Sequence, residues 1–165
     1  MDLFVLRHGD AGRHSMMFRD DSKRSLTVDG KKEIGEITKG LESLGVEIDY
    51  IFTSPLLRSK QTAEIVFDNM KCKNQISELE ELKPEGNRLQ LYKKLATLKQ
   101  NSSVLIVGHE PYLSELIGEA ISGGSSRIDL KKGGLARIRT ISLLPKIQGE
   151  LRWLMTPKHM KKMAK

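Results

Sequence analysis

Two histidines and two arginines are the residues of this sequence best suited to chemistry. Arg7-His8 and His109 each come directly after a short apolar run, and Arg58 lies five residues after another such run. A neutral imidazole at His8 can attack phosphorus and carry the phosphoryl group covalently. The planar guanidinium forks of arginine match phosphate oxygens. This set of residue types therefore favours phosphoryl transfer through a histidine.

The neighbours of these residues suit the same chemistry. Gly9 would let the backbone approach a bound anion closely. His109, in its protonated form, would neutralise charge that grows on the equatorial oxygens. Ser54-Pro55 is predicted to begin a helix, with serine as the N-cap and proline at the first helical position. The positive end of that helix would point toward the anion.

Short apolar runs alternate with helical patterns along the chain. We predict strands over 3–6, 50–53, 76–82 and 104–108, helices over 27–45, 54–70, 91–98 and 111–121, and a final pair of strands over 135–143 and 150–155. This order predicts an α/β fold, a three-layer sandwich with a mostly parallel central sheet that ends in an antiparallel strand pair. Sheets of this kind hold ligands beyond the carboxyl ends of their strands, where His8 and His109 lie.

The chain has 165 residues, which is enough for one domain of ordinary size. We expect a single domain over 1–157 and a basic C-terminal tail over 158–165. No apolar run approaches the roughly 20 residues of a membrane span, and the first residues do not resemble a signal peptide. We therefore expect a cytoplasmic monomer that does not contact membranes.

Positive charge is concentrated in the second half of the sequence. The net charge is −3 over residues 1–85 and +10 over 86–165. A basic half could meet nucleic acid, an acidic protein or a phosphorylated substrate. Nucleic acid is disfavoured because aromatic residues, which stack on bases, are only 5% of the chain. Arg24 and Arg127 are candidates for contacts to a phosphorylated partner. His14, in a loop, could contact the substrate, but we expect it to be solvated.

The single cysteine, Cys72, limits the other kinds of chemistry. One cysteine cannot form an intramolecular disulfide or a cysteine-based zinc site. A cysteine phosphatase needs an arginine six residues after the cysteine, and no arginine appears until Arg88. No cluster with metal-ligand spacing is evident either. We therefore expect neither a metal nor another cofactor.

Four segments of the sequence resemble one family, the histidine phosphatase superfamily with the phosphoglycerate-mutase-like fold. They are Arg7-His8-Gly9, the Leu-Thr-x-x-Gly of 26–30, the Thr-Ser-Pro-Leu-x-Arg-x-x-Gln-Thr-Ala of 53–63 and the Val-Gly-His-Glu-Pro of 107–111. The short length and the Arg-His-Gly-Asp-Ala start resemble the SixA-type branch of phosphohistidine phosphatases. The resemblance implies that His8 is the nucleophile and that Arg7, Arg58 and His109 form the phosphate pocket.

A general acid for the leaving group has no clear candidate. Glu81 and Glu85 lie near a predicted turn, and Asp10 directly follows Gly9. An alkoxide needs a proton as it leaves, whereas imidazole leaving a phosphoramidate is a far better leaving group. A phosphohistidine in a protein is therefore the leading substrate. A small phosphomonoester is the alternative, and a non-catalytic module that binds phosphate or nucleic acid is a third possibility.

Overall fold

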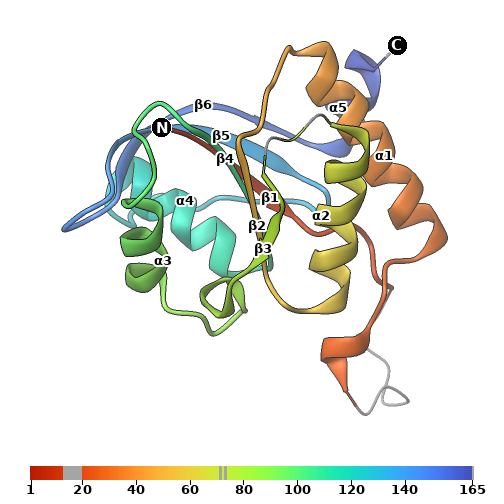
Figure 1. Ribbon diagram of the computed structural model, residues 1–165, viewed down its shortest axis with the longest axis horizontal. Helices are drawn as coiled ribbons and strands as arrows, with labels where there is room; N and C mark the ends of the chain where they lie inside the picture. The colour runs from red at the N-terminus through yellow and green to blue at the C-terminus, as the bar shows by residue number, and fades with distance from the viewer. Residues whose placement is uncertain (13–19, 71, 73, 165) are drawn as a thin grey trace.

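The computed structural model describes residues 1–12, 20–70, 72 and 74–164, and these form a sheet of six strands with helices on both faces (Figure 1). The strands are β1 (Asp2–Arg7), β2 (Tyr50–Thr53), β3 (Ile76–Glu78), β4 (Ser103–Gly108), β5 (Leu135–Ser142) and β6 (Gln148–Met155). The helices are η1 (Asp21–Lys23), α1 (Val28–Ser43), α2 (Leu57–Asn69), η2 (Glu80–Leu82), α3 (Arg88–Leu95), α4 (Tyr112–Ser122) and α5 (Pro157–Met163).

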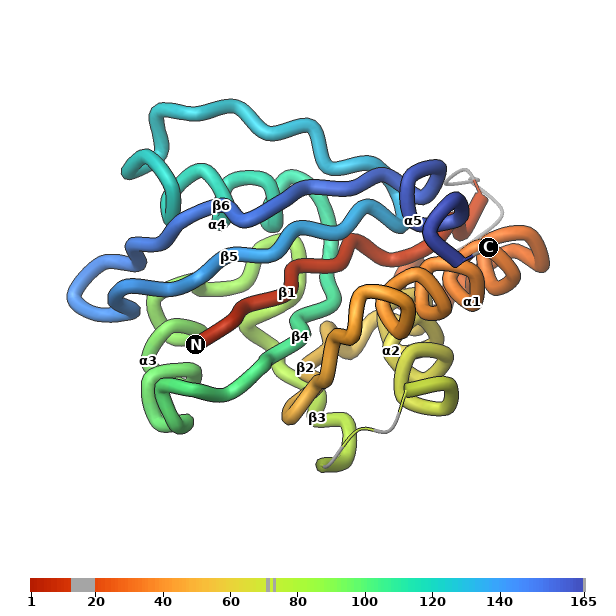
Figure 2. Tube along the Cα trace, turned by 90° about the horizontal axis from the view of Figure 1, so that it is seen from above, coloured from red at the N-terminus to blue at the C-terminus, as the bar shows by residue number. Residues whose placement is uncertain are grey.

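The strand order is β3-β2-β4-β1-β5-β6. The first four strands of this order pair in parallel, whereas β5 runs antiparallel to β1 and β6 antiparallel to β5. Figure 2 shows β1 between β4 and β5, in the middle of the sheet. The carboxyl ends of β1, β2 and β4 therefore lie side by side, as the sequence predicts.

Alternating side chains of the central strands build one core on each face of the sheet. Leu3 and Val5 of β1 pack into the core beneath α3 and α4, while Phe4 and Leu6 pack into the core beneath α1, α2 and α5. Successive residues of a strand point to opposite faces, so a strand that is apolar throughout must be covered on both. The three-layer sandwich that the sequence predicts is confirmed.

One predicted helix cap is confirmed and the other is wrong. Thr27 caps α1 as predicted, its side chain accepting a hydrogen bond from the Gly30 amide. However, α2 begins at Leu57, after an N-cap residue, Leu56, that makes no side-chain cap. Ser54 lies three residues before the first residue of this helix and does not cap it; its hydroxyl contacts His109 at 2.8 Å.

The predicted basic tail is instead a packed helix. Residues 158–163 belong to α5, which lies against α1. Met160 is fully buried there, and Lys161 pairs with Glu33 and Glu36 of α1 at 3.0 and 3.2 Å. The lysines and methionines of this segment form an amphipathic helix with one apolar contact.

The predicted strand over 76–82 is shorter than expected. Pairing with β2 covers Ile76–Glu78, and the following residues turn into η2. Leu82 of η2 is buried against the core on the α3 side. In the part of the chain that the structure describes, no helix has the length and apolar character needed to cross a membrane.

Candidate active site

The carboxyl end of β1 places His8 in a buried position with one defined tautomer. The His8 side chain is only 6% exposed, and its Nδ1 lies 2.7 Å from the Gly9 carbonyl oxygen. A carbonyl only accepts hydrogen bonds, so Nδ1 carries the ring proton and donates it. The lone pair of the neutral ring is therefore on Nε2, which is the atom that can attack phosphorus.

The first turn of α2 brings Arg58 to that nucleophilic nitrogen. The Arg58 Nε–H donates to His8 Nε2 at 3.2 Å, although the two residues are 50 positions apart in the chain. Arg58 is 4% exposed, so its guanidinium is largely removed from water. A phosphoryl group at Nε2 would therefore meet a charged fork directly beside it.

Asp21 holds Arg58 in this orientation, and the sequence analysis did not identify it. Arg58 donates from NH1 to the Asp21 carbonyl oxygen at 3.0 Å, and its NH2 pairs with the Asp21 carboxylate at 3.0 Å. The same carboxylate pairs with Arg24 Nε at 2.8 Å. The only sequence signal for Asp21 was its place in a polar loop, which gives no indication of a partner 37 residues away.

His109 follows β4 and lies beside His8. The two ring centroids are 5.1 Å apart, with 57° between the ring planes. His109 is 2% exposed, and its Nε2 lies 2.8 Å from the Ser54 hydroxyl and 3.3 Å from the Ser59 hydroxyl. Its Nδ1 is buried and has no hydrogen-bond partner among the described residues.

Burial and neighbouring positive charge keep both imidazoles neutral. Burial lowers the pKa of His8 to about 4, and the charges of Arg58, Arg7 and Arg24 act in the same direction. Burial lowers the pKa of His109 to about 3, with further contributions from His8 and Arg58. A neutral His8 is ready to act as a nucleophile near neutral pH. A protonated His109 does not fit this environment, so the positive charge comes from the arginines.

The Arg7 guanidinium is held at one nitrogen and has another buried nitrogen without a partner among the described residues. Its NH1 donates to the Leu130 carbonyl oxygen at 2.9 Å, from the segment between α4 and β5. Its Nε is buried with no partner in the described part of the chain. Buried polar atoms without partners are rare in folded proteins and call for an explanation. At this position, a bound anion would supply the missing acceptor.

Gly9 has a packing role at this site. A side-chain carbon at Gly9 would lie 2.8 Å from Ile34 Cγ1 of α1, closer than such contacts allow. The Gly9 amide donates to Thr62 Oγ1 at 3.2 Å. Thr62 therefore holds the backbone at Gly9, the residue whose carbonyl oxygen accepts the hydrogen bond from His8 Nδ1. A direct contact between Gly9 and phosphate stays a prediction.

The carboxylates considered as general acids are engaged elsewhere. Glu81 pairs with Lys94 at 2.9 Å, and hydrogen bonding from that ammonium lowers the pKa of Glu81. Asp10 pairs with Lys132 at 2.6 Å, and the hydrogen bond from Lys132 lowers the pKa of Asp10. A general acid needs a raised pKa, so both pairs oppose that role. Glu85 makes no contact that brings it to His8 in the structure.

The remaining candidates divide between the site and other surfaces. Arg24 lies close to the site, since its charge acts on both imidazoles, and it donates to the Gly12 carbonyl oxygen at 3.0 Å. Arg127 lies away from it, in a depression beside α4. His14 lies outside the described residues. Burial raises the pKa of Cys72, which is the opposite of a reactive thiolate.

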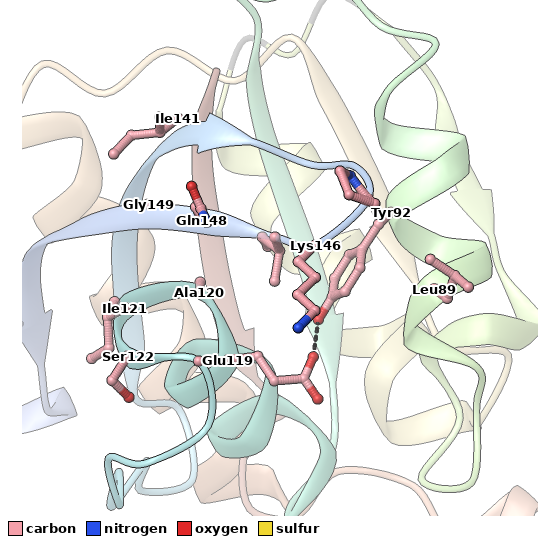
Figure 3. Close-up of a pocket in the computed structure, with 13 residues that line it drawn as sticks. Leu89, Tyr92, Glu119, Ala120, Ile121, Ser122, Ile141, Lys146, Gln148 and Gly149 are labelled. Atoms are coloured by element: carbon pink, nitrogen blue, oxygen red, sulfur yellow. Dashed lines mark hydrogen bonds between the residues drawn. The ribbon is translucent and has the colours of Figure 1, made fainter.

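The described residues contain no group of three or more histidine, cysteine or acidic side chains that could hold a metal ion. A cavity of about 590 Å³ is present, but it lies far from His8, between α3, the end of α4 and the β5–β6 hairpin (Figure 3). Tyr92 and Glu119 line it and are joined by a hydrogen bond of 2.6 Å. None of the predicted site residues lines this cavity.

Comparisons with known proteins agree with this geometry. The family model of the histidine phosphatase superfamily (branch 1) matches residues 3–84. The phosphohistidine phosphatase SixA of Escherichia coli K12 is 31% identical over 167 residues, covering 100% of this chain and 99% of that protein. An uncharacterised protein of Picosynechococcus is 33% identical over 148 residues, covering 85% of this chain and 86% of that protein.

A solved structure matches the whole fold. It is the protein histidine phosphatase SixA complexed with tungstate, with a TM-score of 0.85 and 30% sequence identity. The match covers 98% of this chain and 100% of that one. The likeness therefore extends from β1 to α5 and includes the segments that carry His8, Arg58 and His109.

Proposed function

The chain belongs to the histidine phosphatase superfamily, and from this premise we propose that it is a phosphohistidine phosphatase with His8 as its nucleophile. The observation that carries the proposal is the His8–Arg58 pair. A neutral imidazole presents the lone pair of Nε2, and a buried guanidinium lies 3.2 Å from that atom. Nucleophile and anion-binding group are thus in place together.

The reaction would proceed in two displacements at phosphorus. In the first, the hydrogen bond from Arg58 Nε–H to His8 Nε2 breaks, and the lone pair of Nε2 forms a bond to phosphorus. The bond from phosphorus to the leaving group breaks in the same step, and the leaving group takes that electron pair. In the second, water attacks the phosphohistidine, loses a proton to solvent, and the Nε2–phosphorus bond breaks to release phosphate. Arg7, Arg58 and His109 would bind the equatorial oxygens, where charge accumulates in both steps.

The basicity of the leaving group favours phosphohistidine over a phosphate ester as the substrate. An alkoxide leaving from a phosphate ester is strongly basic and needs a proton from a nearby acid. Glu81 and Asp10 are paired with lysines instead, and their pKa values are lowered. The imidazole of a substrate phosphohistidine leaves without such help. The SixA relatives, which are named for this substrate, support the same choice.

We further infer that the partner is a protein that carries a phosphorylated histidine, and that the enzyme works as a cytoplasmic monomer without a metal ion. The single cysteine fits a reducing compartment. A small phosphomonoester remains the second substrate class. A purely phosphate-binding role is disfavoured, because the arginines alone would bind phosphate without two neutral imidazoles beside them.

A substrate panel tests the proposal. It would compare a phosphohistidine-containing protein domain, a phosphoserine peptide, a sugar phosphate and an aryl phosphate at equal concentrations. We expect kcat/KM to be highest for the phosphohistidine domain, with vanadate or tungstate inhibiting more strongly than inorganic phosphate because they resemble the in-line transition state. A preference for the sugar phosphate, or turnover that survives in His8→Ala, would contradict it.

A further inference from the structure

The second histidine of the site is held by two serine hydroxyls. Ser54 directly follows β2, Ser59 lies in α2, and both are fully buried. Their hydroxyl oxygens lie 2.8 and 3.3 Å from the same atom, Nε2 of His109. Two hydroxyls therefore converge on one nitrogen from separate points of the chain.

The direction of these hydrogen bonds follows from the partners available. The Ser54 oxygen already accepts a hydrogen bond from the Leu56 amide at 3.4 Å. In the described part of the chain, His109 Nε2 is the acceptor within reach of the Ser54 hydroxyl hydrogen. If Nε2 carried the ring proton, the buried hydroxyl hydrogens of Ser54 and Ser59 would both be left without this acceptor. Buried donors without acceptors are strongly avoided.

We infer that Ser54 and Ser59 are positioning residues that hold His109 as the tautomer with its proton on Nδ1. The Ser54 hydroxyl donates the shorter hydrogen bond, 2.8 Å, to the lone pair of Nε2. The Ser59 hydroxyl donates a longer one, 3.3 Å, to the same atom. The orphaned Nδ1 of His109 is then a donor without an acceptor in the protein. This inference rests on the proposed function, in which the missing acceptor is a phosphoryl oxygen.

In this arrangement, His109 and the arginines would make different contributions to the site. His109 contributes a neutral, oriented N–H, while Arg58 and Arg7 contribute the charge. The low pKa of His109, which burial causes, agrees with a ring that stays neutral near pH 7. A hydrogen bond aimed at a developing charge needs no reorganisation when the reaction occurs, which is the main benefit of a fixed tautomer.

Nitrogen-15 NMR of histidine-labelled protein tests the inference without any turnover. Two-bond nitrogen–proton correlations distinguish the two neutral tautomers, and the His109→Gln variant assigns the signals of His109 among the four histidines. We expect the wild-type ring to carry its proton on Nδ1. Ser54→Ala/Ser59→Ala should show a mixture of tautomers or a proton on Nε2, whereas Ser54→Thr should keep the wild-type pattern.

Kinetics provide the second readout. Deleting a transition-state donor costs about 10²–10³ in rate, so mispositioning it in the double alanine variant should lower kcat by about 10-fold or more with little change in KM. Ser102→Ala is the matched control, since Ser102 is a buried serine at the other end of β4, and it should leave kcat unchanged.

The outcomes separate this inference from the proposed function. A wild-type His109 with its proton on Nε2, or an unchanged tautomer in the folded double variant, would overturn the inference even if the enzyme is a phosphohistidine phosphatase. Conversely, a protein that fails to hydrolyse phosphohistidine but shows the predicted change of tautomer would contradict only the proposed function.

Discussion

Two polar clusters in this molecule differ in how their charges are balanced. Between α3 and α4, Arg88 pairs with Glu115 at 2.8 Å and with Glu119 at 2.6 Å, and the Tyr92 hydroxyl donates to Glu119 at 2.6 Å. Each charge there faces an opposite one. At the carboxyl end of the sheet, arginines instead surround two neutral imidazoles, and Asp21 offsets only part of the positive charge.

The contrast distinguishes a structural cluster from a functional one. In the Arg88 cluster the charged groups pair with one another, so they can stabilise the packing of α3 on α4. The His8 cluster has lowered imidazole pKa values and two orphaned nitrogen atoms, Arg7 Nε and His109 Nδ1. Perturbed groups that a protein leaves unpaired are typical of sites that an external ligand completes.

Removing the nucleophile should have the largest effect. His8→Ala is expected to abolish turnover, because it removes the imidazole nitrogen that lies beside Arg58 and that would attack phosphorus. Quenching wild-type turnover without acid should trap an acid-labile, base-stable phosphate on the chain, and His8→Ala should show none. His109→Ala should still form this phosphoenzyme, but about 10²–10³ times more slowly. A trapped phosphate on His109 or His14 would refute the assignment.

Arginine-to-lysine substitutions compare the two clusters directly. Arg58→Lys should lower kcat/KM by about 10²-fold, since one ammonium cannot replace a planar fork. Arg88→Lys, the matched control between α3 and α4, should leave kcat/KM within about twofold of wild type. Steady-state kinetics on the phosphohistidine substrate measure both. Equal losses in the two variants would mean that the clusters do not differ in the way described above.

The neutral imidazoles should make the fold sensitive to mild acid. The unfolded chain protonates His8 and His109 near pH 6.5, whereas the folded protein does so only near pH 4 and pH 3. The unfolded state therefore binds more protons in this window, and the free energy of unfolding should fall as the pH drops from about 6.5 to 4.

Urea denaturation at pH 7 and at pH 4.5 measures this sensitivity. Each unit of pKa shift corresponds to about 1.4 kcal/mol, and both imidazoles contribute about two units between pH 6.5 and 4.5, so the loss should reach up to about 5 kcal/mol. The variant His8→Asn/His109→Asn should lose clearly less stability over the same interval. An equal loss in wild type and variant would assign the acid sensitivity to other groups.

Removing the hydroxyl of Tyr92 should affect stability alone. Tyr92→Phe deletes the hydrogen bond to Glu119, which Arg88 still neutralises, so we expect a loss of about 1 kcal/mol in the free energy of unfolding. Because this residue lines the cavity of Figure 3 rather than the His8 site, kcat should not change. A lower kcat with unchanged stability would connect that cavity to catalysis.

Chelation should have the smallest effect. The positive charge that phosphoryl transfer needs is supplied by Arg7 and Arg58 in the proposed mechanism. We therefore expect the initial rate to be unchanged after dialysis against EDTA. Loss of activity that a divalent ion restores would show that the arginines are insufficient.

The sequence predicted the arrangement of strands well, because apolar runs such as 104–108 must be buried on both faces. It also placed His8, Arg58 and His109 at one edge of the sheet, and the structure brings these three residues together. It missed Asp21, Ser59 and Thr62, since their partners lie 37, 50 and 53 residues away and no local pattern encodes such contacts. The predicted start of α2 at Ser54 is three residues too early. A serine followed by proline is typical of a helix start, and the contact of Ser54 with His109, 55 residues away, has no local sequence signal.

The close approach of α1 to the end of β1 has a consequence for how the protein tolerates change. A side-chain carbon at Gly30 would overlap the Asp10 carbonyl oxygen, and one at Gly9 would lie 3.2 Å from the Gly30 carbonyl oxygen. The helix and the segment after His8 therefore fit together only while both positions lack side chains. In a survey of natural variants or a saturation library, position 30 would consequently behave like a catalytic position, although it touches no phosphate. Its intolerance would report the fit between two backbone segments rather than any chemistry.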